Sequence, residues 1–386
     1  MNFVEHIIQS IDEGVQVDVV YTDFCKAFDQ VNYNTLLRTM HLFGFSDDLI
    51  KLFVSYFKNR RQYVIFKGEK SVEYIVTSGV PQGSVLGPCL FIMLIDGITR
   101  SLRHSSLMLL FADDLKIFRV IRSILDAQKL QEDLDAIAKW AADNNLTFNV
   151  KKCSVVTFSK LKAPILNDYT LQGITLKRGE EVKDLALILP KTLSFSFHIN
   201  KAVSKAYRNL GFVIRQSRNF QSVNTIKVLY FAYVRSILEY ASVVWNPIPQ
   251  YCRDAIEKVQ KKFLRFLYYK ISGNYRYDIS YIELLNIFEM DSLEKRRRLA
   301  QLLHLHKILN NYVDDQFCLS QINFYVPPFQ SRSTTLFSVP YRRTSLGYNS
   351  PINTMMRLYN KLPHVMDILN ANRASLLRQL SINLQN

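Results

Sequence analysis

Two adjacent aspartates, Asp113 and Asp114, lie between two short apolar runs in the segment LMLLFADDLKIFRV, residues 107–120. The segments on both sides, residues 107–112 and 115–120, have the apolar character of short strands, which predicts a β-hairpin with the aspartates at or beside its turn. Ionised carboxylates in apolar surroundings are costly unless they are paired, and neighbouring ones repel each other. The pair is therefore either an ordinary polar turn or part of a cation site, and an isolated pair favours the turn.

A third carboxylate, Asp23, directly follows the segment VQVDVVYT, residues 15–22, whose β-branched residues predict a strand. If this strand lies beside the hairpin, Asp23 converges with the aspartate pair. Carboxylate oxygens with room for water and phosphate suit Mg²⁺ or Mn²⁺. Two such ions about 4 Å apart can activate an attacking hydroxyl and stabilise a leaving pyrophosphate.

The rest of the chain changes character near residue 160. Before that point, the patterns predict helices at 1–13, 34–45, 46–60 and 124–146, a hairpin at 62–80, and a Gly/Pro turn leading into a helix that ends near residue 102. After it, a hairpin-like segment at 169–189 is followed by helical stretches at 198–215, 222–242, 251–269, 281–310 and 352–378. A Pro- and Ser-rich break is expected at 326–345.

The formal net charge of +16 is unevenly distributed. Residues 1–160 contain 18 basic and 18 acidic residues, so the whole surplus lies in residues 161–386. This distribution predicts a polyanionic partner bound mainly by the C-terminal region, although a merely basic surface is an alternative.

Two helical segments of this basic region carry clustered cations. In EKVQKKFLRFLYYK, residues 257–270, aromatic residues alternate with Lys258, Lys261, Lys262 and Arg265. The cationic side could follow a nucleic-acid backbone, or the aromatic stripe could face a core and leave a solvated face; the pattern favours neither. Arg296–Arg298 could contact phosphates or act as a nuclear address.

Five scattered cysteines without a CxxC pair make a disulfide framework or zinc ribbon improbable. The N-terminus has no signal-peptide core, and the longest apolar run, residues 85–95, is too short to span a bilayer. We therefore expect an intracellular protein, in the nucleus and/or the cytoplasm, with no membrane partner. The sequence does not reveal the oligomeric state.

Four segments carry a specific resemblance: YTDFCKAFDQV (21–31), SGVPQGSVLGP (78–88), FADD (111–114) and NVKKC (149–153). In this order and spacing they resemble motifs A, B, C and D of reverse transcriptases, in the form typical of jockey-like non-LTR retrotransposons. The segments KDLALIL (183–189), HINKAVSKAYRNLGFVIR (198–215) and LEYASVVWNP (238–247) also resemble the region that follows the polymerase core in these elements. The resemblance covers essentially the whole chain.

The resemblance implies roles for the carboxylates. Asp23 and Asp113 would be the principal ligands of two Mg²⁺ or Mn²⁺ ions, with the carbonyl of Phe24 completing a site and Asp114 in support. Lys152 matches the motif D lysine and could protonate the leaving pyrophosphate, although a solvated basic strand end is nearly as good an interpretation.

Other positions would contact substrates. Phe28 occupies the family's steric-gate position beside the sugar of the incoming nucleotide, although it could also be a core phenylalanine. Gln82 and Gly83 would line the nucleotide and template side, while Asp29 is expected to cap or pair locally. In the turn that holds the primer end in the family, Ala186 replaces a glycine, which predicts a distorted turn.

The resemblance implies an α+β fold. Residues 1–190 would form a reverse-transcriptase palm, an antiparallel four-stranded sheet backed by helices, followed by a thumb-like helical region (191–270) and a helical C-terminal extension (271–386). Only about 20 residues precede Asp23, so the family's fingers region and upstream endonuclease are expected to be missing.

The predicted function is two-metal, RNA-directed DNA synthesis with an RNA template, a DNA primer and dNTPs. The alternative is a truncated, catalytically dead remnant that only binds RNA or DNA.

Overall fold

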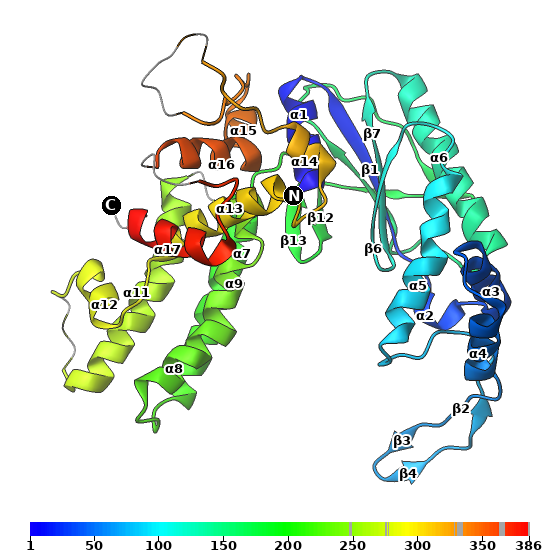
Figure 1. The fold of residues 1–386 in the computed structure, drawn as a ribbon, viewed down its shortest axis with the longest axis horizontal. Coiled ribbons are helices and arrows are strands. Elements are labelled where there is room, and N and C mark those ends of the chain that lie inside the picture. The colour runs from blue at the N-terminus through cyan, green and yellow to red at the C-terminus, as the bar shows by residue number, and fades with distance from the viewer. Residues whose placement is uncertain are drawn as a thin grey trace. The chain divides into compact units, whose positions relative to one another are not determined.

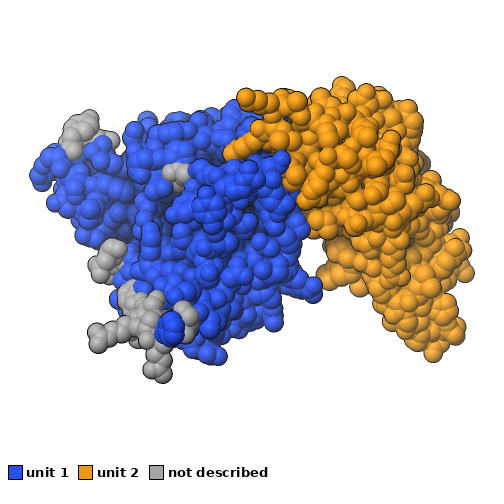
Figure 2. Space-filling view, turned by 90° about the horizontal axis from the view of Figure 1, so that it is seen from above, with its two compact units in different colours: residues 1–14, 181–386 blue, residues 15–180 orange. Residues whose placement is uncertain are grey.

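The computed structural model describes residues 1–246, 249–274, 276, 278–327, 329, 335–362 and 367–384. The chain forms two compact units (Figure 2). One unit comprises residues 15–180, and the other comprises residues 1–14 together with residues 181–386. No helix among the described residues is long and apolar enough to cross a bilayer.

The first unit, residues 15–180, is built on a five-stranded sheet in the order β11-β8-β1-β7-β6. Figure 1 labels β1, β6 and β7 of this sheet. Its strands are β1 (Gln16–Thr22), β6 (Leu107–Phe111), β7 (Asp114–Ile121), β8 (Ser154–Phe158) and β11 (Lys177–Gly179). The pairs β8-β1, β1-β7 and β7-β6 are antiparallel, whereas β11 is parallel to β8. The predicted four-stranded antiparallel sheet is thus present, with one additional short edge strand.

Strand β1 lies in the middle of the sheet because its β-branched residues are buried on both faces. Val17, Val19 and Val20 are at most 1% exposed. Val20 belongs to a core that also includes side chains of α5 (Leu86–Asp96) and α6 (Ile124–Asp143). These helices therefore pack against the sheet. Asp23 directly follows the last residue of the buried strand β1.

The remaining elements of this unit include the predicted helices at 34–45 and 46–60 and the predicted hairpin at 62–80, and also a short helix at 27–30, which was not predicted. They are α2 (Ala27–Gln30), α3 (Tyr33–Leu42), α4 (Asp47–Phe57), β2 (Arg61–Gln62), β3 (Ile65–Phe66), β4 (Glu69–Lys70), β5 (Tyr74–Ile75), η1 (Gly97–Ser101), β9 (Thr170–Leu171) and β10 (Ile174–Thr175). Ser46 caps α4 by accepting a hydrogen bond from the Leu49 N–H.

The second unit is mainly helical. Its elements are α1 (Asn2–Asp12), β12 (Glu181–Asp184), β13 (Leu187–Pro190), α7 (Ser196–Gln216), α8 (Val223–Tyr230), a π-helical turn (Phe231–Arg235), α9 (Ser236–Glu239), α10 (Ser242–Trp245), α11 (Gln250–Ser272), α12 (Tyr281–Ile287), α13 (Leu293–Leu309), α14 (Gln316–Ser320), α15 (Ser345–Tyr348), α16 (Pro351–Asn360) and α17 (Arg373–Asn383).

Three predicted helices are interrupted. The stretch 222–242 contains the π-helical turn, 281–310 divides into α12 and α13, and 352–378 divides into α16 and α17. Ser292 and Asn372 cap the new helix starts through their side chains, which explains why these helices begin there. The predicted break at 326–345 lies partly outside the described residues.

Helix α1 belongs to the second unit rather than to the unit that contains the sheet. Its apolar side chains Phe3, Val4, Ile7, Ile8 and Ile11 are at most 4% exposed. Its carboxylates accept backbone hydrogen bonds from the C-terminal region: Glu5 from the Ile352 N–H at 2.6 Å, and Asp12 from the Thr344 N–H at 2.7 Å. The compact units thus divide after residues 14 and 180. The division into a palm (1–190), a thumb-like region (191–270) and a C-terminal extension (271–386) stays a prediction.

The turn between β12 and β13 keeps a left-handed conformation without a glycine. Leu185 and Ala186 have φ values of 44° and 66°, and the Tyr240 hydroxyl donates a hydrogen bond to the Leu185 carbonyl at 2.9 Å. Left-handed backbone costs about 1–2 kcal/mol for a residue with a Cβ. The sequence predicted that alanine in place of glycine would distort this turn. In the structure both turn residues keep positive φ values, and the substitution costs backbone strain.

Candidate active site

The predicted carboxylates lie at one end of two paired strands. Thr22 of β1 pairs with Leu115 of β7, so Asp23 and Asp114 are the next residues on adjacent strands. In the β6-β7 hairpin Phe111 pairs with Asp114, which leaves Ala112 and Asp113 in the turn. Asp23 and Asp113 are half-buried, and Asp114 is exposed. The hairpin prediction is confirmed.

Lys152 lies beside Asp23, with 3.3 Å between its Nζ and the Asp23 Oδ2. The chain just before Lys152 lies beside the end of β1. The Asn149 N–H donates a hydrogen bond to the Asp23 carbonyl at 2.7 Å. The rings of Phe24 and Phe148 also stack there, with 4.4 Å between their centroids. The Lys152 ammonium is therefore held at a carboxylate, while its role in proton transfer stays a prediction.

The donor atoms suit a hard cation, but they are not gathered into a closed cluster. The Asp23 Oδ2 is buried and has no hydrogen-bond donor of good geometry, although Lys152 balances its charge. Among the described residues, no group of three or more His, Cys, Asp or Glu side chains is arranged to hold a metal ion. The assignment of Asp23, Asp113 and Asp114 as metal ligands stays a prediction.

The predicted substrate-contacting residues connect motif A with motif B. Gln82 Nε2 donates a hydrogen bond to Asp29 Oδ1 at 2.8 Å, so Asp29 pairs across 53 residues rather than locally. The Val80 N–H donates to the Phe28 carbonyl at 2.9 Å. The half-buried Phe28 ring stacks on Phe91 with 4.4 Å between centroids. Gln82 and Gly83 are exposed.

Gly79 makes the closest approach between these two segments. A Cβ at this position would lie 2.9 Å from both Cα and O of Asp29, and its φ is +90°. We expect Gly79→Ala to lower the free energy of unfolding by about 3 kcal/mol or more, because backbone strain and overpacking add. Urea unfolding followed by circular dichroism measures this.

The matched control is Gly44→Ala. Gly44 has a φ of +83°, but no atom lies within 4 Å of the place that a Cβ would occupy there. This substitution should cost only the roughly 1–2 kcal/mol of left-handed strain. Equal losses for the two variants would show that the contact with Asp29 is unimportant.

The buried face of α11 includes one of its aromatic residues. Phe263, Leu264 and Leu267 are fully buried, and Phe263 stacks on Tyr230 with 4.0 Å between centroids. Lys258 and Lys262 are exposed, whereas Lys261 and Arg265 are half-buried. Phe263 therefore serves packing, whereas Tyr269 is 46% exposed. Nucleic-acid binding by the cationic face stays a prediction.

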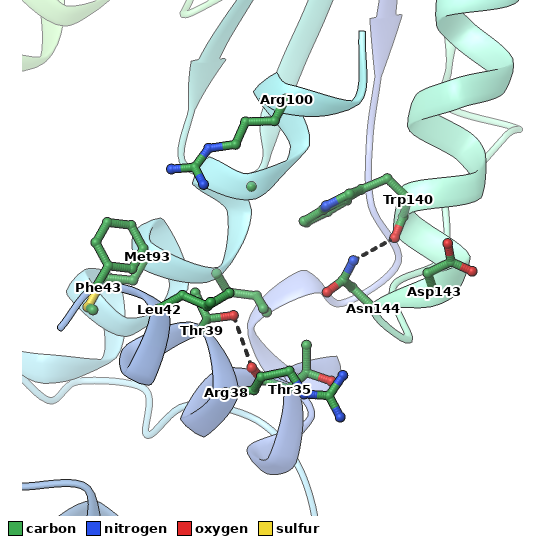
Figure 3. Close-up of a pocket in the computed structure, with 12 residues that line it drawn as sticks. Thr35, Arg38, Thr39, Leu42, Phe43, Met93, Arg100, Trp140, Asp143 and Asn144 are labelled. Carbon is green, nitrogen blue, oxygen red and sulfur yellow. Dashed lines mark hydrogen bonds between the residues drawn. The ribbon is translucent and has the colours of Figure 1, made fainter. Parts of the chain in front are cut away.

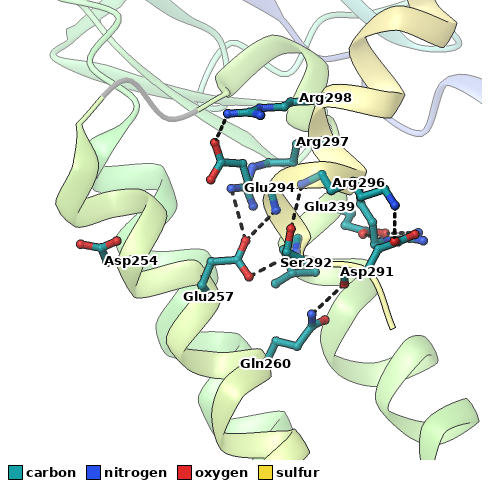
Figure 4. A network of polar contacts seen from close by, with 12 residues as sticks. Glu239, Asp254, Glu257, Gln260, Asp291, Ser292, Glu294, Arg296, Arg297 and Arg298 are labelled. Carbon is teal, nitrogen blue, oxygen red and sulfur yellow. Dashed lines mark hydrogen bonds and ion pairs between the residues drawn. The ribbon is translucent and has the colours of Figure 1, made fainter. Parts of the chain in front are cut away.

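The three arginines of α13 are engaged inside the second unit (Figure 4). Arg296 pairs with Glu239, and Arg298 pairs with Glu294. Arg297 is 2% exposed and lies 3.8 Å from Glu257; burial lowers its pKa and Glu257 opposes that shift. The expectation that Arg296–Arg298 contact phosphates or form a nuclear address is wrong for Arg297, because a buried guanidinium reaches neither partner.

Sequence reasoning missed a cationic stripe on α7. Its exposed residues are Lys201, Lys205, Arg208, Phe212 and Arg215, spaced so that they share one helix face. Helix α7 packs along α11: the Tyr251 hydroxyl lies 3.0 Å from the Ser196 Oγ, and Lys262 Nζ lies 5.6 Å from the centroid of the Tyr207 ring. The spacing of the basic residues was a signal that could have found it.

A pocket of about 210 Å³ lies in the first unit between α3, the end of α5 and the end of α6 (Figure 3). Arg38, Arg100 and Trp140 are among its lining residues. None of the predicted site residues lines it, so it is separate from the carboxylate site.

Comparison with known proteins identifies the class. The family model for reverse transcriptase (RNA-dependent DNA polymerase) matches residues 13–214. The chain therefore belongs to the reverse transcriptase family.

Similar proteins include the RNA-directed DNA polymerases from mobile element jockey. That of Drosophila funebris is 28% identical over 70% of this chain and 30% of its own length. That of Drosophila melanogaster is 30% identical over 66% of this chain and 28% of its own length. The chain thus spans about 30% of these relatives. Apo telomerase from Candida tropicalis aligns with a TM-score of 0.40 and 12% identity, over 78% of this chain and 48% of the telomerase.

Proposed function

We propose that this chain carries the palm of a non-LTR retrotransposon polymerase and performs RNA-directed DNA synthesis. Its partners are an RNA template, a DNA primer and dNTPs, and it acts in the nucleus and/or cytoplasm. The main support is the placement of the carboxylates. Asp23 and Asp114 are the next residues beyond the Thr22–Leu115 pair on adjacent strands, and Asp113 lies in the turn next to Asp114. Lys152 Nζ lies 3.3 Å from the Asp23 carboxylate.

Asp23, Asp113 and the carbonyl of Phe24, supported by Asp114, would hold two divalent ions, Mg²⁺ or Mn²⁺. When bound, such ions lower the pKa of the primer hydroxyl and offset the charge of the leaving pyrophosphate. Lys152 carries a proton within reach of the carboxylate site and donates it to the pyrophosphate as the general acid. Gln82 and Gly83 contact the nucleotide and template side.

Primer extension on poly(rA)/oligo(dT) tests this function. With Mg²⁺ or Mn²⁺, the purified chain should incorporate labelled dTTP in a template-dependent way, and EDTA should abolish incorporation. Template-independent incorporation, or extension that survives EDTA, would contradict the proposal.

A chain that only binds RNA or DNA is the second candidate, because the described carboxylates do not form a closed metal-binding group. It predicts tight binding of primer–template without extension at any Mg²⁺ or Mn²⁺ concentration. Filter binding performed in the extension buffer separates the two candidates.

Phe28 is proposed to exclude ribonucleotides. Phe28→Ala should increase rNTP relative to dNTP incorporation by about ten- to a hundredfold, since the vacated volume accommodates a 2′-OH. A two-nucleotide competition assay measures the ratio.

Phe53→Ala is the control, because Phe53 is another half-buried ring packed against the same core. It should lower stability without changing sugar selectivity. Unchanged selectivity in Phe28→Ala, or an equal change in both variants, would remove Phe28 from this role.

A further inference from the structure

An exposed β-ribbon, residues 58–76, extends from the end of α4 away from the sheet (Figure 1). Strand β2 pairs with β5, and β3 pairs with β4. Lys67 and Gly68 form the turn with φ values of 52° and 88°, as a two-residue hairpin requires. The ribbon is thus a defined arm.

Large apolar side chains of the ribbon remain exposed to solvent. Their exposed fractions are Tyr63 45%, Val64 59%, Ile65 65%, Phe66 70%, Val72 87%, Tyr74 50% and Ile75 60%. An isolated two-stranded ribbon is marginally stable in water, and a contiguous exposed apolar surface usually marks an interaction site.

The ribbon also concentrates positive charge. It contains five basic residues, Lys58, Arg60, Arg61, Lys67 and Lys70, and two acidic ones, Glu69 and Glu73. The whole first unit has 21 basic and 17 acidic residues, so the ribbon supplies most of its surplus. Glu73 already contacts Arg61 and Lys70, at 3.8 and 2.8 Å. No carboxylate of the described chain is paired with Lys58, Arg60 or Lys67.

Cations and aromatic rings are placed next to each other along the ribbon and at its base. Lys70 Nζ lies 3.8 Å from the centroid of the Tyr63 ring, Lys67 Nζ 5.6 Å from that of Phe66, and Arg60 Cζ 5.4 Å from that of Tyr56. Rings that stack on bases beside cations that contact phosphates are the two components of single-strand binding surfaces.

We propose that this ribbon binds a single-stranded segment of nucleic acid, with Tyr63 and Phe66 stacking on bases and Lys58, Arg60 and Lys67 contacting phosphates. The positive surplus favours this partner over an apolar protein surface. This inference rests on the proposed function, because that function identifies the bound strand as the template RNA.

Fluorescence anisotropy of the full chain with labelled 20-nucleotide oligouridylate tests the stacking residues. Tyr63→Ala/Phe66→Ala should weaken binding by tenfold or more. The same variant should bind a blunt RNA–DNA hybrid as the wild type does, because paired bases are not free to stack. The affinity of the wild-type protein for oligodeoxythymidylate of the same length, compared with its affinity for oligouridylate, shows whether it prefers single-stranded RNA or DNA.

A salt series tests the cations. Arg60→Gln/Lys67→Gln should reduce the slope of log K against log salt by between about 1 and 2. Lys129→Gln/Lys139→Gln, which removes two exposed charges from α6, should leave the slope nearly unchanged. Equal effects of the two charge variants would overturn the inference, as would wild-type affinity in the ring variant.

A change in oligomeric state without a change in RNA affinity would point to a protein interface and would also overturn it. Failure of the polymerase proposal is distinguishable, because the binding measurements require no extension. If the ribbon variants lose RNA binding while the wild type never extends a primer, only the polymerase function fails.

Discussion

Asp113→Asn is expected to lower primer extension by on the order of 10³-fold, while the free energy of unfolding stays the same or rises slightly. An amide in the β6-β7 turn keeps the shape of the side chain but loses the negative charge that holds a divalent ion. Asp113, in the turn, lies next to Asp114, so removing one of two like charges also relieves repulsion. Single-nucleotide incorporation and urea unfolding measure the two effects.

Asp135→Asn serves as the control, because Asp135 is an exposed carboxylate on α6 and is not part of the β6-β7 hairpin. It should leave extension unchanged. Calorimetric titration with Mn²⁺ provides a second readout that needs no turnover, and Asp113→Asn should lose most of the binding heat. Extension by Asp113→Asn at nearly the wild-type rate would show that the metal-ligand assignment is wrong.

Ile8→Asp is expected to destabilise the second unit by several kcal/mol, enough to lower its melting temperature by about 10 °C. Ile8 is 3% exposed on the buried face of α1, and an unpaired charge introduced there cannot be hydrated. Neighbouring Glu5 and Asp12 tie the same helix to Ile352 and Thr344. Calorimetry and limited proteolysis should show that residues 293–384 become accessible.

Ile282→Asp is the matched control, since Ile282 belongs to the same unit and is 70% exposed. It should leave the melting temperature within a few degrees of the wild type. If Ile8→Asp melted like this control, α1 would not be packed against the C-terminal region.

Several features could be predicted from the sequence because they depend on residues close together in the chain. The short apolar segments on either side of Asp113-Asp114 predict the β6-β7 hairpin, and the β-branched run before Asp23 predicts β1. The Lys67-Gly68 pair likewise sets the turn of the ribbon. In each case the local backbone preference and the apolar pattern favour the same structure.

The carboxylate site could be predicted only in part. Strand pairing brings Asp23 next to the hairpin, as expected, because adjacent strands end at the same edge. The contact of Lys152 with Asp23 is a tertiary contact whose distance no motif specifies.

The tertiary structure alone decided where the long-range polar contacts lie. Arg297 belongs to a run of three arginines, and the sequence of this run does not show which of them is buried. In the structure Arg297 is buried near Glu257, so it pairs with a carboxylate and does not face solvent. Likewise, the apolar face of α1 predicts a helix but not its partner, which lies more than 300 residues away. Periodicity determines that a face is buried, whereas the surface that covers it is chosen by packing among all the elements at once.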